Sequence, residues 1–113
     1  MINGFDEETK PLTEDELALV PLFVRSLSTK IGKENAITNT EIRKRLKDKG
    51  IEVGSDPARI RKIINHIRLN KLVKNLLAGS NGYWVETDPE RIEEYKMSLM
   101  QRATAILAIW KTY

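Results

Sequence analysis

A stripe of isoleucines in the middle of the chain constrains the fold more than any other feature of the sequence. It consists of Ile60, Ile63, Ile64 and Ile67. Because these residues recur at spacings of three and four, they share one face of an α-helix, and most side chains between them are basic or amide. Ser55-Asp56-Pro57 precedes the stripe and supplies a capping side chain and a proline suited to a first helical turn. The sequence therefore predicts a central amphipathic helix with one face in a core.

Two more helices are predicted before the stripe, and each begins with a threonine followed three residues later by a glutamate, the pattern of a capping box. Thr13 and Glu16 open a helix over about 14–30, in which Pro21 is a local defect that kinks or splits it. The same pattern opens a shorter helix over about 39–49, which ends before a glycine suited to a left-handed cap.

The apolar period changes from about 3.6 to 2 after the stripe, which indicates strands rather than helix. A strand is predicted over 72–77, a turn over 78–82 that ends in Asn-Gly, and a returning strand over 83–85. Thr87-Asp88-Pro89 then opens a last helix that extends to about residue 111. The expected fold class is mainly α with a small β-hairpin.

Length and composition restrict the function. A chain of 113 residues, 41% of them hydrophobic, supports one core, so we expect one domain. Zero cysteines exclude a disulfide framework and thiolate catalysis, and a single histidine leaves little for a transition-metal site. No apolar run reaches the roughly 18–20 residues of a membrane span, and the acidic first ten residues do not resemble a signal peptide. We therefore expect a cytoplasmic protein with no metal, cofactor or membrane contact.

The basic residues are concentrated in the middle of the chain. Residues 25–74 hold 14 lysines and arginines against five acidic residues, whereas residues 1–24 hold one base against six acids. The net charge of the whole chain is only +3. Because a partner meets the local charge rather than the net charge, an anionic partner is expected at the middle segment.

The order of the motifs resembles that of a known family. An Ile-Thr-x-x-Glu-Ile entry, a serine before the isoleucine-bearing helix, a Leu-Val pair and a Gly-Tyr-Trp return follow one another between residues 36 and 87. This segment, about half of the chain, resembles the winged helix-turn-helix proteins of bacteria and their phages. The long last helix resembles the C-terminal extensions of small phage and mobile-element members. The resemblance implies a three-helix core plus wing that binds double-stranded DNA without catalysis, in transcription regulation or in phage or plasmid DNA replication.

The resemblance divides the chain into a flexible lead (1–12), a winged-helix domain (13–87) and a C-terminal helix (88–113). In such proteins the third helix enters the major groove, where arginine can pair with guanine and asparagine with adenine. Ala58 and the polar side chains of this helix are expected to turn away from the isoleucine face. The residues predicted to contact DNA here are Ser55, Arg59, Arg61, Lys62, Asn65 and His66.

A second set of residues is predicted to contact the DNA backbone, which fixes register without reading sequence. It comprises Thr38, Arg43, Lys44, Lys47, Lys71, Lys74 and Asn81. The turn departs from the stronger DNA-binding members of the family, because Ser80-Asn81-Gly82 brings no lysine or arginine to a minor groove. Basic residues on a small helical domain often do no more than face solvent. Duplex binding that weakens with salt would distinguish a DNA-binding surface from such a solvated face.

The last helix is more apolar than one neighbouring helix can cover. An apolar seam recurs along it at spacings of three and four, and a second apolar set widens the seam after Leu99. The residues predicted to pack there are Leu99, Ile106, Leu107 and Trp110. They are expected to cover the first helix, a second copy of the chain, or both, and the second copy would give a homodimer that reads two half-sites. The alternative is a monomer whose first and last helices fully cover each other.

Two other functional classes compete with DNA binding. A protein–protein interaction module on the same scaffold, without DNA binding, is favoured by the uncharged turn and the acidic N-terminal segment. An enzyme is disfavoured, because Glu93-Glu94 and Asp6-Glu7-Glu8 are adjacent carboxylates rather than a converging pair, and the sequence has no glycine-rich phosphate loop.

Overall fold

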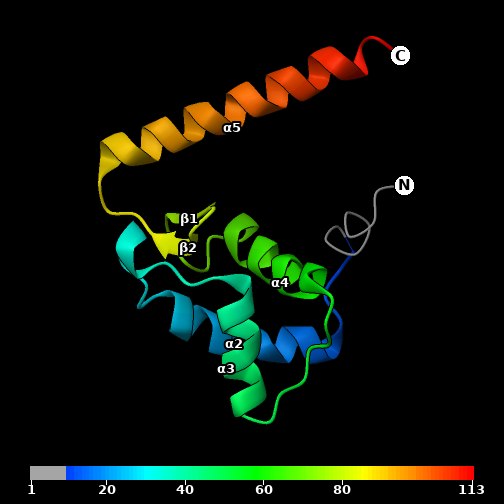
Figure 1. Cartoon of the computed structure of the whole chain (residues 1–113), viewed down its shortest axis with the longest axis vertical. Coiled ribbons are helices and arrows are strands. Elements are labelled where there is room, and N and C mark those ends of the chain that lie inside the picture. The colour runs from blue at the N-terminus through cyan, green and yellow to red at the C-terminus, as the bar shows by residue number, and fades with distance from the viewer. Residues whose placement is uncertain (1–9) are drawn as a thin grey trace.

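The structure, a computed structural model, describes residues 10–113 (Figure 1). It is mainly helical, with one small antiparallel hairpin. The elements are α2 (Glu14–Leu27), η1 (Lys33–Asn35), α3 (Asn39–Asp48), α4 (Pro57–Leu69), β1 (Leu76–Gly79), β2 (Gly82–Val85) and α5 (Pro89–Trp110). Most of the predicted flexible lead, including Asp6-Glu7-Glu8, lies outside the described residues.

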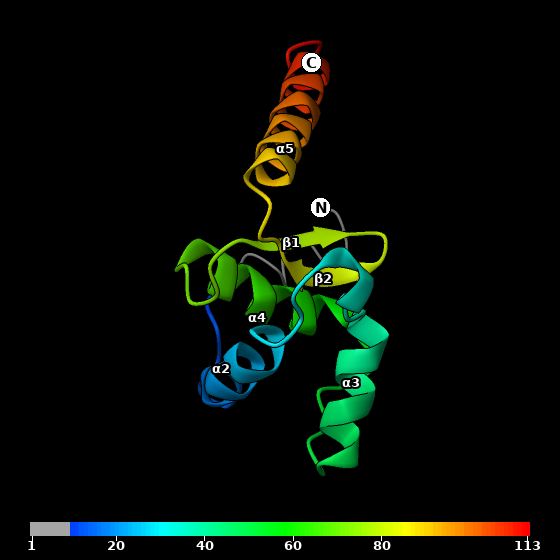
Figure 2. The ribbon, with the colours of Figure 1, turned by 90° about the vertical axis from the view of Figure 1, so that its left-hand side faces the viewer.

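The core lies where α2, α3 and α4 meet beneath the hairpin (Figures 1 and 2). All four isoleucines of the stripe are fully buried on α4, as their spacing predicts. Phe23 and Leu27 of α2, Ile42 and Leu46 of α3, and Leu76 of β1 belong to the same buried cluster. One core therefore joins α2, α3, α4 and the hairpin.

Both predicted capping boxes form. The Thr13 hydroxyl accepts a hydrogen bond from the Glu16 N–H at 3.2 Å, and Glu16 Oε1 accepts one from the Thr13 N–H at 2.9 Å. Thr38 and Glu41 repeat this arrangement at the start of α3. α2 remains a single helix although Pro21 lies inside it.

α2 ends earlier than predicted, because the chain after it turns to meet the hairpin. The Ser28 hydroxyl donates to the Val24 carbonyl at 2.6 Å and closes the last turn. The Val85 N–H then donates to the Lys30 carbonyl at 2.7 Å, and the Gly32 N–H donates to the Val85 carbonyl at 2.9 Å. These bonds hold the end of β2 against the segment after α2.

The strand predicted over 72–77 is wrong in its first four residues. β1 begins only at Leu76, because Lys71 and Asn75 adopt φ values of 54° and 59°, in the left-handed region that an extended strand does not contain. The turn is also tighter than predicted, since β1 and β2 pair up to Gly79 and Gly82 and leave two residues, Ser80-Asn81, between them.

Ile37, just before α3, forms an isolated antiparallel bridge to β2. The Ile37 N–H donates to the Tyr83 carbonyl at 3.0 Å, and the Tyr83 N–H donates to the Ile37 carbonyl at 2.8 Å. Gly82 has a φ of 108°, and a Cβ at this position would overlap the Ile37 carbonyl, so the close approach requires glycine. The hairpin turn is therefore held beside the start of α3 (Figure 2).

A buried carboxylate joins the hairpin to the start of α5. Glu86 accepts hydrogen bonds from the N–H groups of Thr87 and Asp88 at 3.1 and 3.2 Å, and from Trp84 Nε1 at 3.2 Å. The hydrogen bond from the Asp88 N–H lowers the pKa of Glu86 most, against the opposing effect of burial. The glutamate thus remains an ionised acceptor at the point where α5 begins.

α5 does not pack along α2, so within one copy of the chain the first helix does not cover the last helix, as the alternative of a fully covered monomer requires (Figure 1). Only its first turns lie against the body, where Ile92 and Tyr95 are half-buried. The Tyr95 hydroxyl accepts hydrogen bonds from Arg68 Nη2 at 2.9 Å and from the Ala78 N–H at 3.2 Å. Every residue of 96–113 is exposed. In the part of the chain that the structure describes, no helix has both the length and the apolarity to cross a membrane.

Candidate nucleic-acid interface

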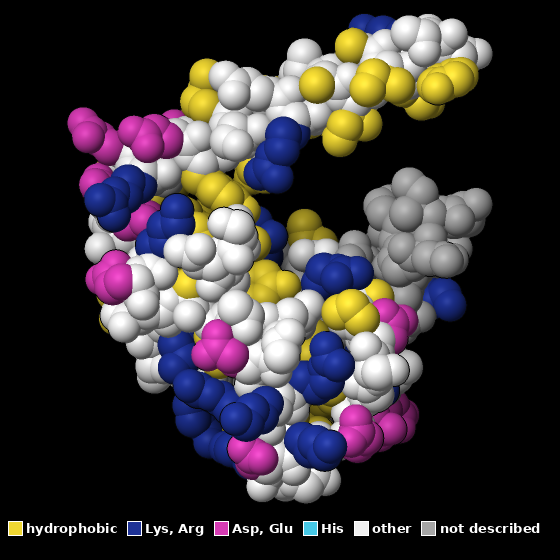
Figure 3. Space-filling view, in the orientation of Figure 1, with side chains coloured by type: hydrophobic (Ala, Val, Ile, Leu, Met, Phe, Trp, Pro, Cys, Tyr) yellow, Lys and Arg dark blue, Asp and Glu magenta, His cyan; other side chains and the backbone are white. Residues whose placement is uncertain are grey.

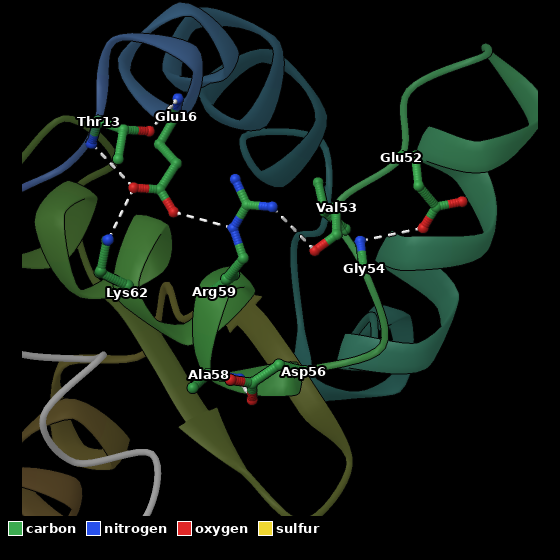
Figure 4. A network of polar contacts seen from close by, with 9 residues as sticks. All are labelled: Thr13, Glu16, Glu52, Val53, Gly54, Asp56, Ala58, Arg59 and Lys62. Atoms are coloured by element: carbon green, nitrogen blue, oxygen red, sulfur yellow. Dashed lines mark hydrogen bonds and ion pairs between the residues drawn. The ribbon is translucent and has the colours of Figure 1, made fainter.

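The α4 residues predicted to read DNA lie in different environments in the structure. The prediction for Lys62 is the one that the structure corrects most clearly. Its side chain is only 3% exposed, and its Nζ lies 2.7 Å from Glu16 Oε1 (Figure 4). The helical period places Lys62 beside the isoleucine face correctly, but α2 packs over that flank and its capping glutamate lies there. Lys62 is therefore part of the α2–α4 packing rather than of a DNA-binding surface. Ala58, also expected to point outward, is fully buried.

Arg59 is also bound within the protein. Its Nε donates to Glu16 Oε2 at 3.2 Å, and its Nη1 donates to the Val53 carbonyl at 3.2 Å (Figure 4). The side chain is 35% exposed, so one edge of the guanidinium still meets solvent. A DNA contact by Arg59 would compete with these bonds, which makes it a weaker candidate than the sequence indicates.

Glu16 is the centre of this network, and the sequence predicts only its capping role. Burial raises the pKa of the carboxyl, but hydrogen bonds from Lys62, the Thr13 N–H and Arg59 outweigh it and lower the pKa to about 2. The carboxylate therefore stays ionised and holds α2 against α4. We call Glu16, Lys62 and Arg59 the Glu16 clamp.

A different face of α4 is partly exposed to solvent. Arg61, Asn65 and Arg68 are spaced at i, i+4 and i+7, and all three are half-exposed. Arg68 donates to the Tyr95 hydroxyl, so the C-terminal end of this α4 face lies at the base of α5. Asn65 and His66 border an open hollow whose other wall is formed by 10–12. Of the predicted reading residues, Arg61 and Asn65 are therefore the best placed.

α3 presents the most continuous cationic surface. Lys44 and Lys47 are exposed on the side of the helix opposite Ile42 and Leu46, which are buried in the core. Arg43 flanks them, half-exposed, and its buried Nε has no hydrogen-bond partner among the described residues. We call Arg43, Lys44 and Lys47 the α3 cation row, and Figure 3 shows lysine and arginine side chains gathered over this part of the molecule.

Three further predicted contact residues lie near the start of α3. Asn39 Nδ2 donates to the Pro57 carbonyl at 3.3 Å, so α3 and α4 begin side by side. Exposed Ser55 directly precedes the α4 cap, and the sheet pairing brings exposed Asn81 to the start of α3. Thr38 lies there too, although its hydroxyl is engaged with Glu41 in the capping box.

Lys71 and Lys74 do not join this surface. Both are exposed, but they follow the C-terminus of α4, whereas α3 begins beside its N-terminus. The helix between these points spans 13 residues, or about 20 Å at 1.5 Å per residue. The predicted backbone contacts therefore form two separate groups.

An open hollow of about 270 Å³ lies between α2 and α3, and nothing in the sequence pattern indicates it. Leu22, Phe23 and Ile42 contribute to its apolar wall, and Arg45 and Lys49 to its edge. The described residues contain no group of three His, Cys, Asp or Glu side chains that could hold a metal ion. Comparisons of the chain with protein-family models, curated proteins and solved structures find no match.

Proposed function

We propose that this chain is a non-enzymatic, winged-helix protein that binds double-stranded DNA. In the proposed complex, the α3 cation row contacts phosphates, and Arg61 and Asn65 on α4 approach base edges in the major groove. The α3 cation row is the observation that carries the proposal, because it places exposed positive charge on the helix whose first residue lies beside the start of α4.

The sheet supports the winged-helix part of the proposal. In that fold a short strand before the first helix of the helix-turn-helix pairs with the returning strand of the hairpin. Here Ile37 precedes α3 and pairs with Tyr83 of β2, which in turn pairs with β1. α3 and α4 correspond in order to the helix-turn-helix, and the hairpin corresponds to the wing. Roles in transcription regulation or in phage or plasmid replication follow from the resemblance of 36–87 and are part of the same proposal.

A matched pair of double variants tests the proposal. We expect Lys44→Gln with Lys47→Gln to weaken binding to a random labelled duplex about tenfold or more, because two phosphate contacts are lost. Lys71→Gln with Lys74→Gln removes the same charge from the far end of α4 and is expected to change binding less than threefold. Fluorescence anisotropy at about 50 mM salt measures both. Equal losses from the two pairs would mean that only net charge matters and would refute the assigned surface.

The second candidate function is a protein–protein interaction module without DNA binding. The hairpin turn favours it, because exposed Ser80 and Asn81 carry no charge. The engagement of Lys62 and Arg59 in the Glu16 clamp also favours it, since two of the predicted reading residues are committed to packing. Absence of duplex binding by the intact protein at low salt would select this function.

A further inference from the structure

The C-terminal part of α5 exposes apolar side chains that a single copy of the chain does not cover. Eight large apolar residues are exposed there: Met97, Leu99, Met100, Ile106, Leu107, Ile109, Trp110 and Tyr113. Trp110 alone is 70% exposed. At 100° per residue, all of these except Met97 fall on one half of the helix circumference. Figure 3 shows these apolar side chains along the projecting end of the molecule.

We propose that a second copy of this chain covers this face, and that the two α5 helices pair antiparallel along residues 97–113. The paired face, which we call the α5 seam, comprises Leu99, Ala103, Ile106, Leu107 and Trp110. A twofold axis then crosses the pair near residue 105, midway along the exposed segment. Each copy contributes the same patch, as a symmetric dimer requires.

The exposed area is sufficient for a stable dimer. Seven large apolar side chains on the half-cylinder, each exposing on the order of 100 Å², offer about 700 Å² per copy, close to the roughly 800 Å² per partner of a standard interface. The same segment contains no acidic residue, and its only charged side chains are Arg102 and Lys111. The centre of the face is therefore uncharged, as the core of an interface is.

The position of the body excludes the parallel orientation. Ile92 and Tyr95 lie on the same face of α5 as the seam, and it is this face that the body occupies at the first turns. A parallel partner helix on the seam would bring its own residues 89–96 into the space that the body fills. In the antiparallel orientation the partner's C-terminal end approaches the body instead, and the partner's body lies beyond Tyr113.

The register sets the distance between the two bodies. When 97–113 pairs with itself about residue 105, Tyr95 and the partner's Tyr95 are offset by 20 residue positions, or about 30 Å at 1.5 Å per residue. This is the separation of the two α5 bases, where each body is attached. The antiparallel pairing does not rest on the proposed function.

Sedimentation equilibrium and matched variants test the pairing. The wild-type protein is expected to have twice the 13.0 kDa chain mass at micromolar concentration. Leu107→Ala with Trp110→Ala is expected to weaken self-association at least 30-fold while circular dichroism stays helical, because both are large apolar side chains of the seam. Met97→Ala removes an equally exposed apolar side chain from the opposite face and is expected to leave the dimer intact. A monomeric wild-type protein would overturn the proposal, whatever its affinity for DNA.

Single-cysteine variants test the orientation, because the natural chain contains no cysteine. In the antiparallel register two copies of residue 106 are offset along the axis by about 3 Å, and two copies of residue 99 by about 18 Å. A disulfide needs Cα atoms within about 7 Å. Ile106→Cys is therefore expected to cross-link under mild oxidation, and Leu99→Cys is not. Efficient cross-linking of Leu99→Cys would show a parallel pair and refute the proposed orientation.

Discussion

Replacing Glu16 with glutamine is expected to destabilise the fold strongly, because this carboxylate binds two cations between α2 and α4. The pKa of Glu16 falls from 4.5 to about 2 on folding. At 1.36 kcal/mol per pKa unit, the ionised carboxylate contributes about 3 kcal/mol to the free energy of unfolding. Glu16→Gln removes this contribution and leaves Lys62, which is 3% exposed, without its carboxylate partner. We therefore expect a loss of about 3 kcal/mol at neutral pH.

The pH dependence of the free energy of unfolding provides a second measurement of the contribution of Glu16. A carboxyl with a lowered folded-state pKa stabilises the protein fully above its unfolded pKa, so the contribution of Glu16 is complete above about pH 5. It declines as the pH falls toward the folded pKa of about 2. Urea unfolding followed by circular dichroism from pH 7 to pH 3 measures both effects. The wild-type protein is expected to lose stability over this range, and Glu16→Gln to lose distinctly less.

Two controls make this prediction refutable. Glu14→Gln removes an exposed charge from the same helical turn and is expected to cost less than about 1 kcal/mol. Lys62→Met added to Glu16→Gln removes the stranded cation and is expected to recover part of the lost stability. If Glu16→Gln unfolds with the free energy and pH dependence of the wild type, the Glu16 clamp does not stabilise the fold and the reasoning fails.

Three further predictions concern the hairpin, the base of α5 and the α4 surface. Gly82→Ala is expected to cost more than about 2 kcal/mol in urea unfolding, because its φ of 108° and the adjacent Ile37 carbonyl exclude a Cβ. Tyr95→Phe removes the acceptor of two hydrogen bonds and is expected to speed amide exchange over 89–96 about tenfold. Arg61→Gln is expected to reduce discrimination between duplex sequences in a selection experiment; unaltered discrimination would remove Arg61 from the reading residues.

The helices were predictable from sequence because their signals are local. A capping box lies within four residues, and the isoleucine stripe requires only the helical period, so α3 and α4 begin where the sequence predicts. The hairpin was predictable in kind but not in extent. The apolar pattern continues through 72–77, whereas the left-handed backbone at Asn75 depends on how the chain leaves α4 and is not visible in that pattern.

The candidate site was less predictable, because it depends on which element packs over which face. A helical wheel places Lys62 on a polar flank, but only the tertiary structure shows that α2 brings Glu16 against that flank. The same packing commits Arg59 and leaves Arg61 and Asn65 as the better-placed residues. For α3 the helical wheel predicts the exposed surface correctly, because a helix that buries only Ile42 and Leu46 must expose the side opposite them. For α5 the sequence shows more apolar surface than one neighbouring helix can cover. In the structure this surface is exposed and includes the α5 seam.

The most direct test of the central claim is the salt dependence of duplex binding by the unmodified protein. If the three residues of the α3 cation row each contact one phosphate, the logarithm of the binding constant falls with the logarithm of salt at a slope of about −2.7. Affinity for a random duplex, measured by fluorescence anisotropy, is then expected to fall about 40-fold between about 50 and 200 mM salt. Binding that is absent at the lower salt concentration, or unchanged between the two, would contradict the proposed DNA-binding function.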